Sequence, residues 1–227
     1  MNALRTYAFR FAFYALSVPV VLAGPLAIPF GRRAVQRYAH GWVRMHRWLA
    51  RAILGVRVRM EGALYDGPAL YVAKHETMFE TFELVDRIDG PLIVLKQELL
   101  RIPVWGAMAR NYGAVAIDRE AGGKAMRQLL REGAAVRAAG RSVLIFPEGT
   151  RVPHGERPAL KPGFVGLYKA MGLPVVPIAS DSGRLVPRHG TARPGTLTLR
   201  FGTPIPPGLP RAEVEARVHA AINALND

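Results

Sequence analysis

The pattern of hydrophobic and polar positions divides the chain into an apolar N-terminal quarter and a longer region in which strands and helices alternate. Residues 11–30 form a run of 20 positions without a charged side chain, which is long enough to cross a bilayer. A glycine and three prolines interrupt this run, namely Pro19, Gly24, Pro25 and Pro29. They argue against one straight helix. The run therefore predicts either a kinked helix held in one leaflet or a true span.

A second helix is predicted over residues 34–54 from two stripes of residues with helical spacing. The apolar stripe consists of Val35, Tyr38, Trp42, Met45, Leu49 and Ala52. The basic stripe consists of Arg37, His40, Arg44, Arg47 and Arg51. We interpret this helix as interfacial, with its apolar side against lipid or protein and its arginines toward phosphate head groups. The alternative is an ordinary surface helix with a solvated charged face.

The distribution of charge favours a membrane surface as the partner of this quarter. The net charge is +14, and residues 1–60 hold ten arginines and no acidic residue. Basic residues that border apolar sequence are typical of proteins at anionic lipid surfaces, whereas a nucleic-acid tail would be polar. We therefore predict that residues 1–54 are membrane-anchoring helices. The absence of cysteine excludes a disulfide scaffold, a cysteine-ligated zinc site and a cysteine nucleophile.

From residue 55 onward the pattern is that of an α/β domain. Strands are predicted over residues 56–61, 69–73, 92–95, 112–117, 142–146, 175–178 and 196–201. Helices are predicted over residues 78–87, 123–139 and 211–225. This alternation predicts a mixed, mostly parallel central sheet with helices on both faces. The expected fold is thus an α/β domain over residues 55–227, preceded by an N-terminal helical membrane anchor.

A candidate catalytic pair follows the second predicted strand. His75 and Glu80 are five positions apart, and on one regular helix their side chains would diverge by about 140°. They can meet only if His75 lies just outside the helix and Glu80 in its first turns. The carboxylate could then accept a hydrogen bond from the imidazole, fix its tautomer and raise its basicity. The alternative is a histidine that caps the helix.

A second signal is the segment Phe-Pro-Glu-Gly-Thr-Arg at residues 146–151, directly after a predicted buried strand. Ligands of α/β sheets bind at the carboxyl ends of strands. Gly149 permits a close backbone approach, and Arg151 can bind a phosphate through two hydrogen bonds. The alternative is a simple turn with a surface pair between Glu148 and Arg151.

Two further segments contain strands with distinctive ends. Residues 113–119 (Gly-Ala-Val-Ala-Ile-Asp-Arg) deliver Arg119 at the carboxyl end of a strand, although a surface ion pair with Asp118 would explain the same residues. Residues 173–178 (Leu-Pro-Val-Val-Pro-Ile) form a strand bracketed by prolines, which we interpret as core scaffolding.

Taken in order, these four segments resemble the motifs of the glycerolipid acyltransferase family over about residues 69–178. The family pattern has His-x-x-x-x-Asp, then Gly-x-x-x-x-x-Arg, then Phe-Pro-Glu-Gly-Thr-Arg, then a strand like Pro-Val-Val-Pro. The six residues at 146–151 are its most specific element. The chain departs from the pattern at Glu80, where aspartate is usual, and at Ala116, where an aromatic residue is common.

The resemblance implies an enzyme of phospholipid biosynthesis. It would transfer a fatty acyl group from acyl carrier protein or coenzyme A to the sn-2 hydroxyl of lysophosphatidic acid, which gives phosphatidic acid. His75 would act as the general base and Glu80 as its orienting partner. The residues implied in binding the acceptor are Gly113, Arg119, Glu148, Gly149, Thr150, Arg151 and Lys161. No metal and no cofactor beyond the thioester co-substrate are expected.

Direct attack by the acceptor is the expected route. The serines of the chain lack a Gly-x-Ser-x-Gly elbow, so a covalent acyl-enzyme has little support. The acceptor stays open, because lyso-ornithine lipid, another lysolipid or glycerol 3-phosphate would suit the same chemistry. A hydrolase and a non-enzymatic basic protein that binds membranes or nucleic acid are further alternatives, but the second leaves the ordered motifs unexplained.

The expected partners are membrane lipids and the acyl thioester carrier, and no nucleic acid. The expected location is the cytoplasmic face of a bacterial inner membrane, because the thioester donors are cytosolic and the arginines favour that side.

Overall fold

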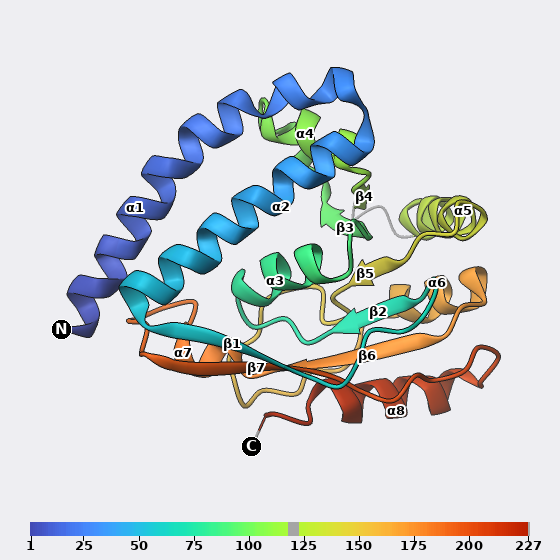
Figure 1. Ribbon diagram of the computed structural model, residues 1–227. Helices are drawn as coiled ribbons and strands as arrows, with labels where there is room; N and C mark the ends of the chain where they lie inside the picture. The colour runs from blue at the N-terminus through green and yellow to red at the C-terminus, as the bar shows by residue number, and fades with distance from the viewer. Residues whose placement is uncertain (118–122, 227) are drawn as a thin grey trace.

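In the computed structural model, which describes residues 1–117 and 123–226, the N-terminal quarter forms a helical hairpin (Figure 1). The first arm is α1 (Asn2–Ala23), and the 3₁₀ turn η1 (Gly24–Phe30) reverses the chain. The second arm is α2 (Arg32–Leu49), which continues into the π-helical turn η2 (Ala50–Leu54). Pro19 lies inside α1, whereas Pro25 and Pro29 lie in η1. The uncharged run is therefore not one straight helix, as its prolines predict.

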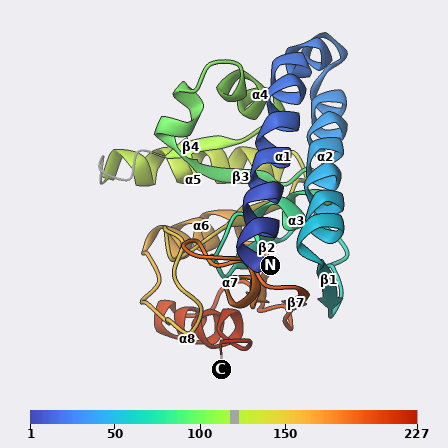
Figure 2. The same cartoon turned by 90° about the vertical axis from the view of Figure 1, so that its left-hand side faces the viewer.

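The outer side of this hairpin is apolar. Within the part of the chain that the structure describes, Asn2–Phe30 is the one helical segment long and apolar enough to cross a membrane, by length and composition. Its exposed apolar side chains are Leu4, Tyr7, Phe11, Tyr14, Leu16, Val18, Leu22, Leu26 and Phe30. Phe9 and Phe13 point the other way and are buried. The two arms lie side by side along one edge of the molecule (Figure 2).

Helix α2 packs on protein with its apolar stripe and with part of its basic stripe. Its apolar stripe joins the main hydrophobic core through Val35, Trp42, Met45 and Leu49. On the basic stripe, Arg47 donates to both carboxylate oxygens of Glu83, at 2.9 and 2.8 Å, and to Asp86 at 2.7 Å. Arg44 donates to Asp86 at 3.3 Å. Arg47, only 28% exposed, is thus paired with carboxylates of α3 (Phe79–Arg87), whereas the side chain of Arg44 stays 67% exposed.

The centre of the described chain is a seven-stranded sheet in the order β1-β7-β6-β2-β5-β3-β4. Its strands are β1 (Val56–Glu61), β2 (Leu70–Ala73), β3 (Leu92–Lys96), β4 (Val115–Ile117), β5 (Val143–Ile145), β6 (Val175–Ser180) and β7 (Gly195–Phe201). Neighbouring strands are parallel except β6 and β7, which are antiparallel. The predicted mixed, mostly parallel sheet is confirmed.

Helices cover both faces of this sheet (Figure 1). Successive residues of β2 alternate between the two faces, because strand side chains have a period of two. Tyr71 and Ala73 belong to the hydrophobic core shared with α1, α2 and α3. Leu70 and Val72 belong to the core shared with α5 (Gly123–Ala138), α6 (Gly163–Met171) and α8 (Arg211–Ile222). The predicted placement of helices on both faces is confirmed.

The structure corrects the predicted elements around residue 112. Tyr112 was expected to begin a strand, but it ends α4 (Trp105–Tyr112), which follows the 3₁₀ turn η3 (Gln97–Arg101). Gly113 has a φ of 99°, which ends the helix and turns the chain into β4. Helices α4 and α6 and the short α7 (Ser182–Leu185) are not predicted by the sequence pattern.

Candidate active site

The two members of the predicted His–carboxylate pair are in contact. Strand β2 ends at Ala73 and α3 begins at Phe79, so His75 lies in the turn between them and Glu80 in the first helical turn. His75 Nδ1 lies 2.9 Å from Glu80 Oε1. This is the arrangement that the five-residue spacing requires if the two side chains are to meet.

Glu80 is held by hydrogen bonds on both of its oxygens. Oε1 accepts from the backbone N–H groups of Glu76 and Thr77, at 2.9 and 2.8 Å. Oε2 accepts from Thr77 Oγ1 at 2.6 Å and from Ser182 Oγ at 2.7 Å. Burial by itself would raise the pKa of Glu80. The hydrogen bond and the charge of His75, together with the hydrogen bonds from Thr77 and Ser182, outweigh burial and lower this pKa. Glu80 is therefore a carboxylate, and the Nδ1–H of His75 is the donor.

The segment after β5 supports His75 from the other side. The ring of Phe146 stacks on the His75 ring, with 4.2 Å between centroids. Glu148 Oε2 accepts from the backbone N–H of His75 at 2.8 Å, and the N–H of Val152 donates to the His75 carbonyl at 2.8 Å. Glu148 is buried, and its carboxylate contacts the turn that carries His75.

Lys74 is a member of this site that the sequence analysis missed. Its side chain is fully buried, and Nζ donates to Glu148 Oε1 at 2.7 Å and to the Glu156 carbonyl at 2.6 Å. Nζ also donates to Asn223 Oδ1 at 2.9 Å. A buried lysine requires such partners, because an isolated ammonium in the interior is costly. The sequence signal that could have identified Lys74 is a lysine directly after an apolar strand.

The remaining predicted residues are only partly brought together. Gly149, Thr150 and Arg151 lie in the loop beside His75, with Thr150 exposed and Arg151 half-buried. The side chain of Lys161 is exposed, and its backbone N–H donates to the Pro147 carbonyl at 2.8 Å, at the start of the same segment.

Gly113 does not join this group. It precedes β4, whereas His75 follows β2. Because β2, β5, β3 and β4 are all parallel, Gly113 lies toward the amino ends of these strands and His75 toward their carboxyl ends. The φ of 99° at Gly113, which residues with a side chain rarely adopt, gives this glycine a structural reason. Arg119 lies outside the described residues, as does Asp118.

An apolar cavity of about 150 Å³ lies between the helical hairpin and the sheet. Residues from α1, α2, α3, α4 and β3 line it, among them Val20, Trp42, Phe82, Leu95, Trp105 and Ala109. Among the described residues, no group of three or more His, Cys, Asp or Glu side chains could hold a metal ion.

Comparison with known proteins places these features in a family context. The model of the family described as Acyltransferase matches residues 55–181. The chain is 34% identical over 212 residues to 1-acyl-sn-glycerol-3-phosphate acyltransferase from Pseudomonas aeruginosa, covering 89% of this chain and 80% of that protein. It is 29% identical over 182 residues to the protein of the same name from Cocos nucifera, covering 78% of this chain and 58% of the plant protein.

A solved structure has the same fold. The crystal structure of the 1-acyl-sn-glycerophosphate (LPA) acyltransferase PlsC from Thermotoga maritima superposes with a TM-score of 0.80, covering 99% of this chain and 95% of that one. The sequences are 22% identical, so this likeness establishes the fold.

Proposed function

The chain belongs to the Acyltransferase family, and on that premise we propose that it transfers a fatty acyl group from a thioester to the sn-2 hydroxyl of lysophosphatidic acid, forming phosphatidic acid. The names of its curated relatives support this acceptor. The observation that carries the proposal is the contact of His75 with the buried Glu80, in the turn at the carboxyl end of β2 and beside the loop that carries Arg151.

In the proposed reaction His75 acts as the general base. Its Nδ1–H is held by Glu80, so Nε2 is the nitrogen that accepts the proton of the acceptor hydroxyl. The hydroxyl oxygen forms a bond to the thioester carbonyl carbon, and the carbon–sulfur bond then breaks. The leaving thiolate takes the proton from the imidazolium, which restores the neutral His75. Glu80 stabilises the imidazolium between these two steps.

The acceptor's phosphate is proposed to bind at the loop of residues 149–151. Arg151 supplies the planar donor group that suits a phosphate, and Gly149 and Thr150 shape the loop around it. Lys161, whose backbone is bonded to the start of the same segment, is a second candidate cation. Arg119 is proposed on its motif alone. Gly113 is proposed to serve the turn into β4 rather than the pocket.

The apolar parts of the molecule suit the lipid partners. We propose that residues 1–54 anchor the protein with the exposed apolar side of α1 in a lipid leaflet, which supports a membrane location. The cavity behind α3 has the apolar lining that an acyl chain requires. The thioester donor is acyl carrier protein or coenzyme A, and the proposed location is the cytoplasmic face of a bacterial inner membrane.

A radiolabelled acyl-transfer assay on the detergent-solubilised protein tests this function. Wild type, His75→Ala and the control His189→Ala are supplied with acyl carrier protein or coenzyme A thioesters and lysophosphatidic acid. His189 is exposed and stands outside the proposed site. The expected result is phosphatidic acid from wild type and control and none from His75→Ala. Retained activity in His75→Ala would overturn the mechanism. A wild type that is silent here but active with lyso-ornithine lipid or glycerol 3-phosphate would overturn the acceptor.

A further inference from the structure

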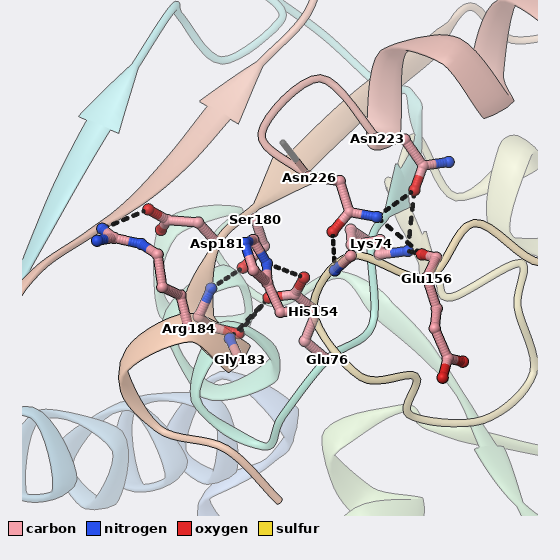
Figure 3. Close-up of polar contacts among 12 residues, drawn as sticks. Lys74, Glu76, His154, Glu156, Ser180, Asp181, Gly183, Arg184, Asn223 and Asn226 are labelled. Atoms are coloured by element: carbon pink, nitrogen blue, oxygen red, sulfur yellow. Dashed lines mark hydrogen bonds and ion pairs between the residues drawn. The ribbon is translucent and has the colours of Figure 1, made fainter. Parts of the chain in front are cut away.

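A second histidine–carboxylate pair lies next to His75 and Glu80. Glu76 follows His75 in the chain, and its Oε1 lies 2.8 Å from Nδ1 of His154, in the loop after Arg151 (Figure 3). The side chains of Glu76 and His154 are 0% and 19% exposed, the same fractions as those of Glu80 and His75. The second pair is thus as enclosed as the proposed catalytic pair, although nothing in the acyl-transfer mechanism above uses it.

Ser182 connects the two pairs. Its Oγ lies 2.7 Å from Glu80 Oε2 and 3.5 Å from Glu76 Oε2. The backbone N–H of Glu76 also donates to Glu80 Oε1 at 2.9 Å. A displacement of Glu76 would therefore move two of the groups that hold Glu80 in place.

Glu76 also fastens α7 to the catalytic turn. Its Oε2 accepts from the backbone N–H of Gly183 at 2.6 Å (Figure 3). A Cβ at position 183 would lie 3.1 Å from Glu76 Oε2 and 3.2 Å from Glu76 Cβ, so glycine permits this close approach. Because Ser182 precedes Gly183, the same contact fixes the hydroxyl that donates to Glu80.

Stability alone gives no reason for this pair. Burial raises the pKa of Glu76, against the hydrogen bonds from Gly183 and His154, so the fold bears a cost for keeping a carboxylate there. Replacing a buried ion pair by apolar residues of similar size is often neutral or favourable for stability. A role in the site explains why charged and hydrogen-bonding groups stand at positions 76 and 154.

The loop that carries His154 is clamped on its far side as well. The N–H of Gly155 donates to Asn226 Oδ1 at 2.7 Å, and Asn226 Nδ2 donates to the Glu156 carbonyl at 2.8 Å. The Glu156 carbonyl also accepts from Lys74, which in turn bonds Asn223 at the end of α8 (Figure 3). These hydrogen bonds fasten the loop to the end of α8, and His154 of the same loop contacts Glu76.

We propose that Glu76 and His154 are positioning residues for acyl transfer. The pair sets the position of the turn that carries His75 against the loop that follows Arg151, and through Ser182 it holds Glu80 in line with His75. Neither residue touches the reacting atoms. This inference rests on the proposed function, in which His75 is the base that Glu80 orients.

Steady-state kinetics of the purified full-length protein test the proposal. Misplacing a reacting group by about 1 Å costs about 100-fold in rate. We expect kcat to fall about 100-fold in Glu76→Ala and about tenfold in His154→Ala, with KM for both substrates within about twofold of wild type. His154→Gln should restore most of kcat, because its amide N–H can donate to Glu76. Wild-type kcat in both alanine variants, or a rise in KM with kcat unchanged, would overturn the proposal.

A double-mutant cycle tests the route through Ser182. If Glu76 acts through that hydroxyl, Glu76→Ala combined with Ser182→Ala should lose little more kcat than the worse single variant. Additive losses would show that Glu76 acts independently of Ser182 and would overturn the route.

Hydrogen–deuterium exchange separates failure of this inference from failure of the proposed function. The amide N–H groups of Glu76 and Thr77 donate to Glu80, and they should exchange faster in His154→Ala than in His189→Ala. Equal exchange would overturn the positioning role whether or not the enzyme is active. A wild type that transfers acyl groups to no acceptor would overturn the proposed function, and the exchange result would still decide the coupling.

Discussion

The two histidine–carboxylate pairs have nearly the same geometry but opposite electrostatics. The N–O distance is 2.9 Å between His75 and Glu80 and 2.8 Å between His154 and Glu76. The pKa of Glu80 is lowered, because hydrogen bonds outweigh its burial, whereas burial raises the pKa of Glu76. The difference lies in the donors. Glu80 receives two backbone N–H groups and two hydroxyls besides the imidazole, and Glu76 receives chiefly one backbone N–H.

This contrast indicates how one arrangement serves two tasks. A carboxylate that is already well stabilised as an anion can face a histidine that gains a proton during the reaction. A carboxylate with few donors depends on its histidine partner and therefore ties two segments together. The distance between the two side chains does not separate these roles, but the number of surrounding donors does.

The largest expected effect comes from removing the support that both pairs share. Lys74→Met leaves Glu148 buried without its cation, and we expect the free energy of unfolding to fall by about 3–5 kcal/mol. Urea denaturation of the detergent-solubilised protein measures this. Lys169→Met on α6 is the matched control, since Lys169 is exposed, and it should change stability by less than about 0.5 kcal/mol. A loss in Lys74→Met no greater than that of the control would contradict a shared support.

Replacing Glu80 and Glu76 in turn by glutamine, which has no charge, tests whether the two histidine–carboxylate pairs differ in role. Glu80→Gln should lower kcat by about 10²–10³-fold, because the imidazolium loses its counter-charge. Glu76→Gln should lower kcat by less than about tenfold, because the glutamine oxygen still accepts from Gly183. Both are measured by steady-state acyl transfer at saturating substrates. Equal losses in the two variants would mean that the pairs do not differ in role.

A third histidine shows what burial does without a carboxylate. His46 lies among the rings of Phe9, Phe13, Phe79 and Phe82, and burial, with a smaller contribution from Arg47, lowers its pKa from 6.5 to about 4. The unfolded chain then binds a proton more readily than the folded one. The contribution of His46 to the free energy of unfolding is therefore fully present above pH 6.5. It declines as the pH falls toward 4, by up to about 3 kcal/mol.

This pH dependence is measured as the difference in unfolding free energy between wild type and His46→Leu, followed from pH 8 to pH 4. The common titration of the other groups cancels in that difference. A difference that stays constant with pH would show that His46 is not buried in its neutral form.

The smallest expected effect comes from a change that touches neither pair. Ala109 lines the apolar cavity, and Ala109→Leu reduces its volume. The ratio of kcat/KM for long acyl donors to kcat/KM for short acyl donors should fall by about tenfold. Activity on the short donors should be retained. Ala159→Leu, at an exposed position, should leave the ratio unchanged. A ratio unaltered in Ala109→Leu would place the acyl chain elsewhere.

The sequence predicted the contact of His75 with Glu80 because it depends on local geometry. Five residues across a strand-to-helix turn leave few arrangements in which the two side chains meet. The contact between Glu76 and His154 joins residues 78 positions apart, and no local sequence pattern predicts it. Only the folded sheet brings the ends of β2 and β5 together.

The same reasoning explains which elements were missed. The strands of the sheet and the helix α3 follow clear hydrophobic patterns. Helix α6 has apolar residues on most of its sides, because it packs between the sheet, α5 and α8. Its glycines at 163 and 166 further weaken the helical signal. The helix α4 was hidden because Tyr112 extends the apolar run of β4 across the turn at Gly113.

The contact between Lys74 and Asn223 spans 149 residues, and this separation orders events during synthesis. Helix α1, with its exposed apolar side, leaves the ribosome well before the end of α8. The nascent chain can therefore reach a lipid surface long before its loop of residues 152–157 is fastened. The hydrogen bonds that support the turn of His75 from α8 are therefore completed only after α1 is free to meet lipid.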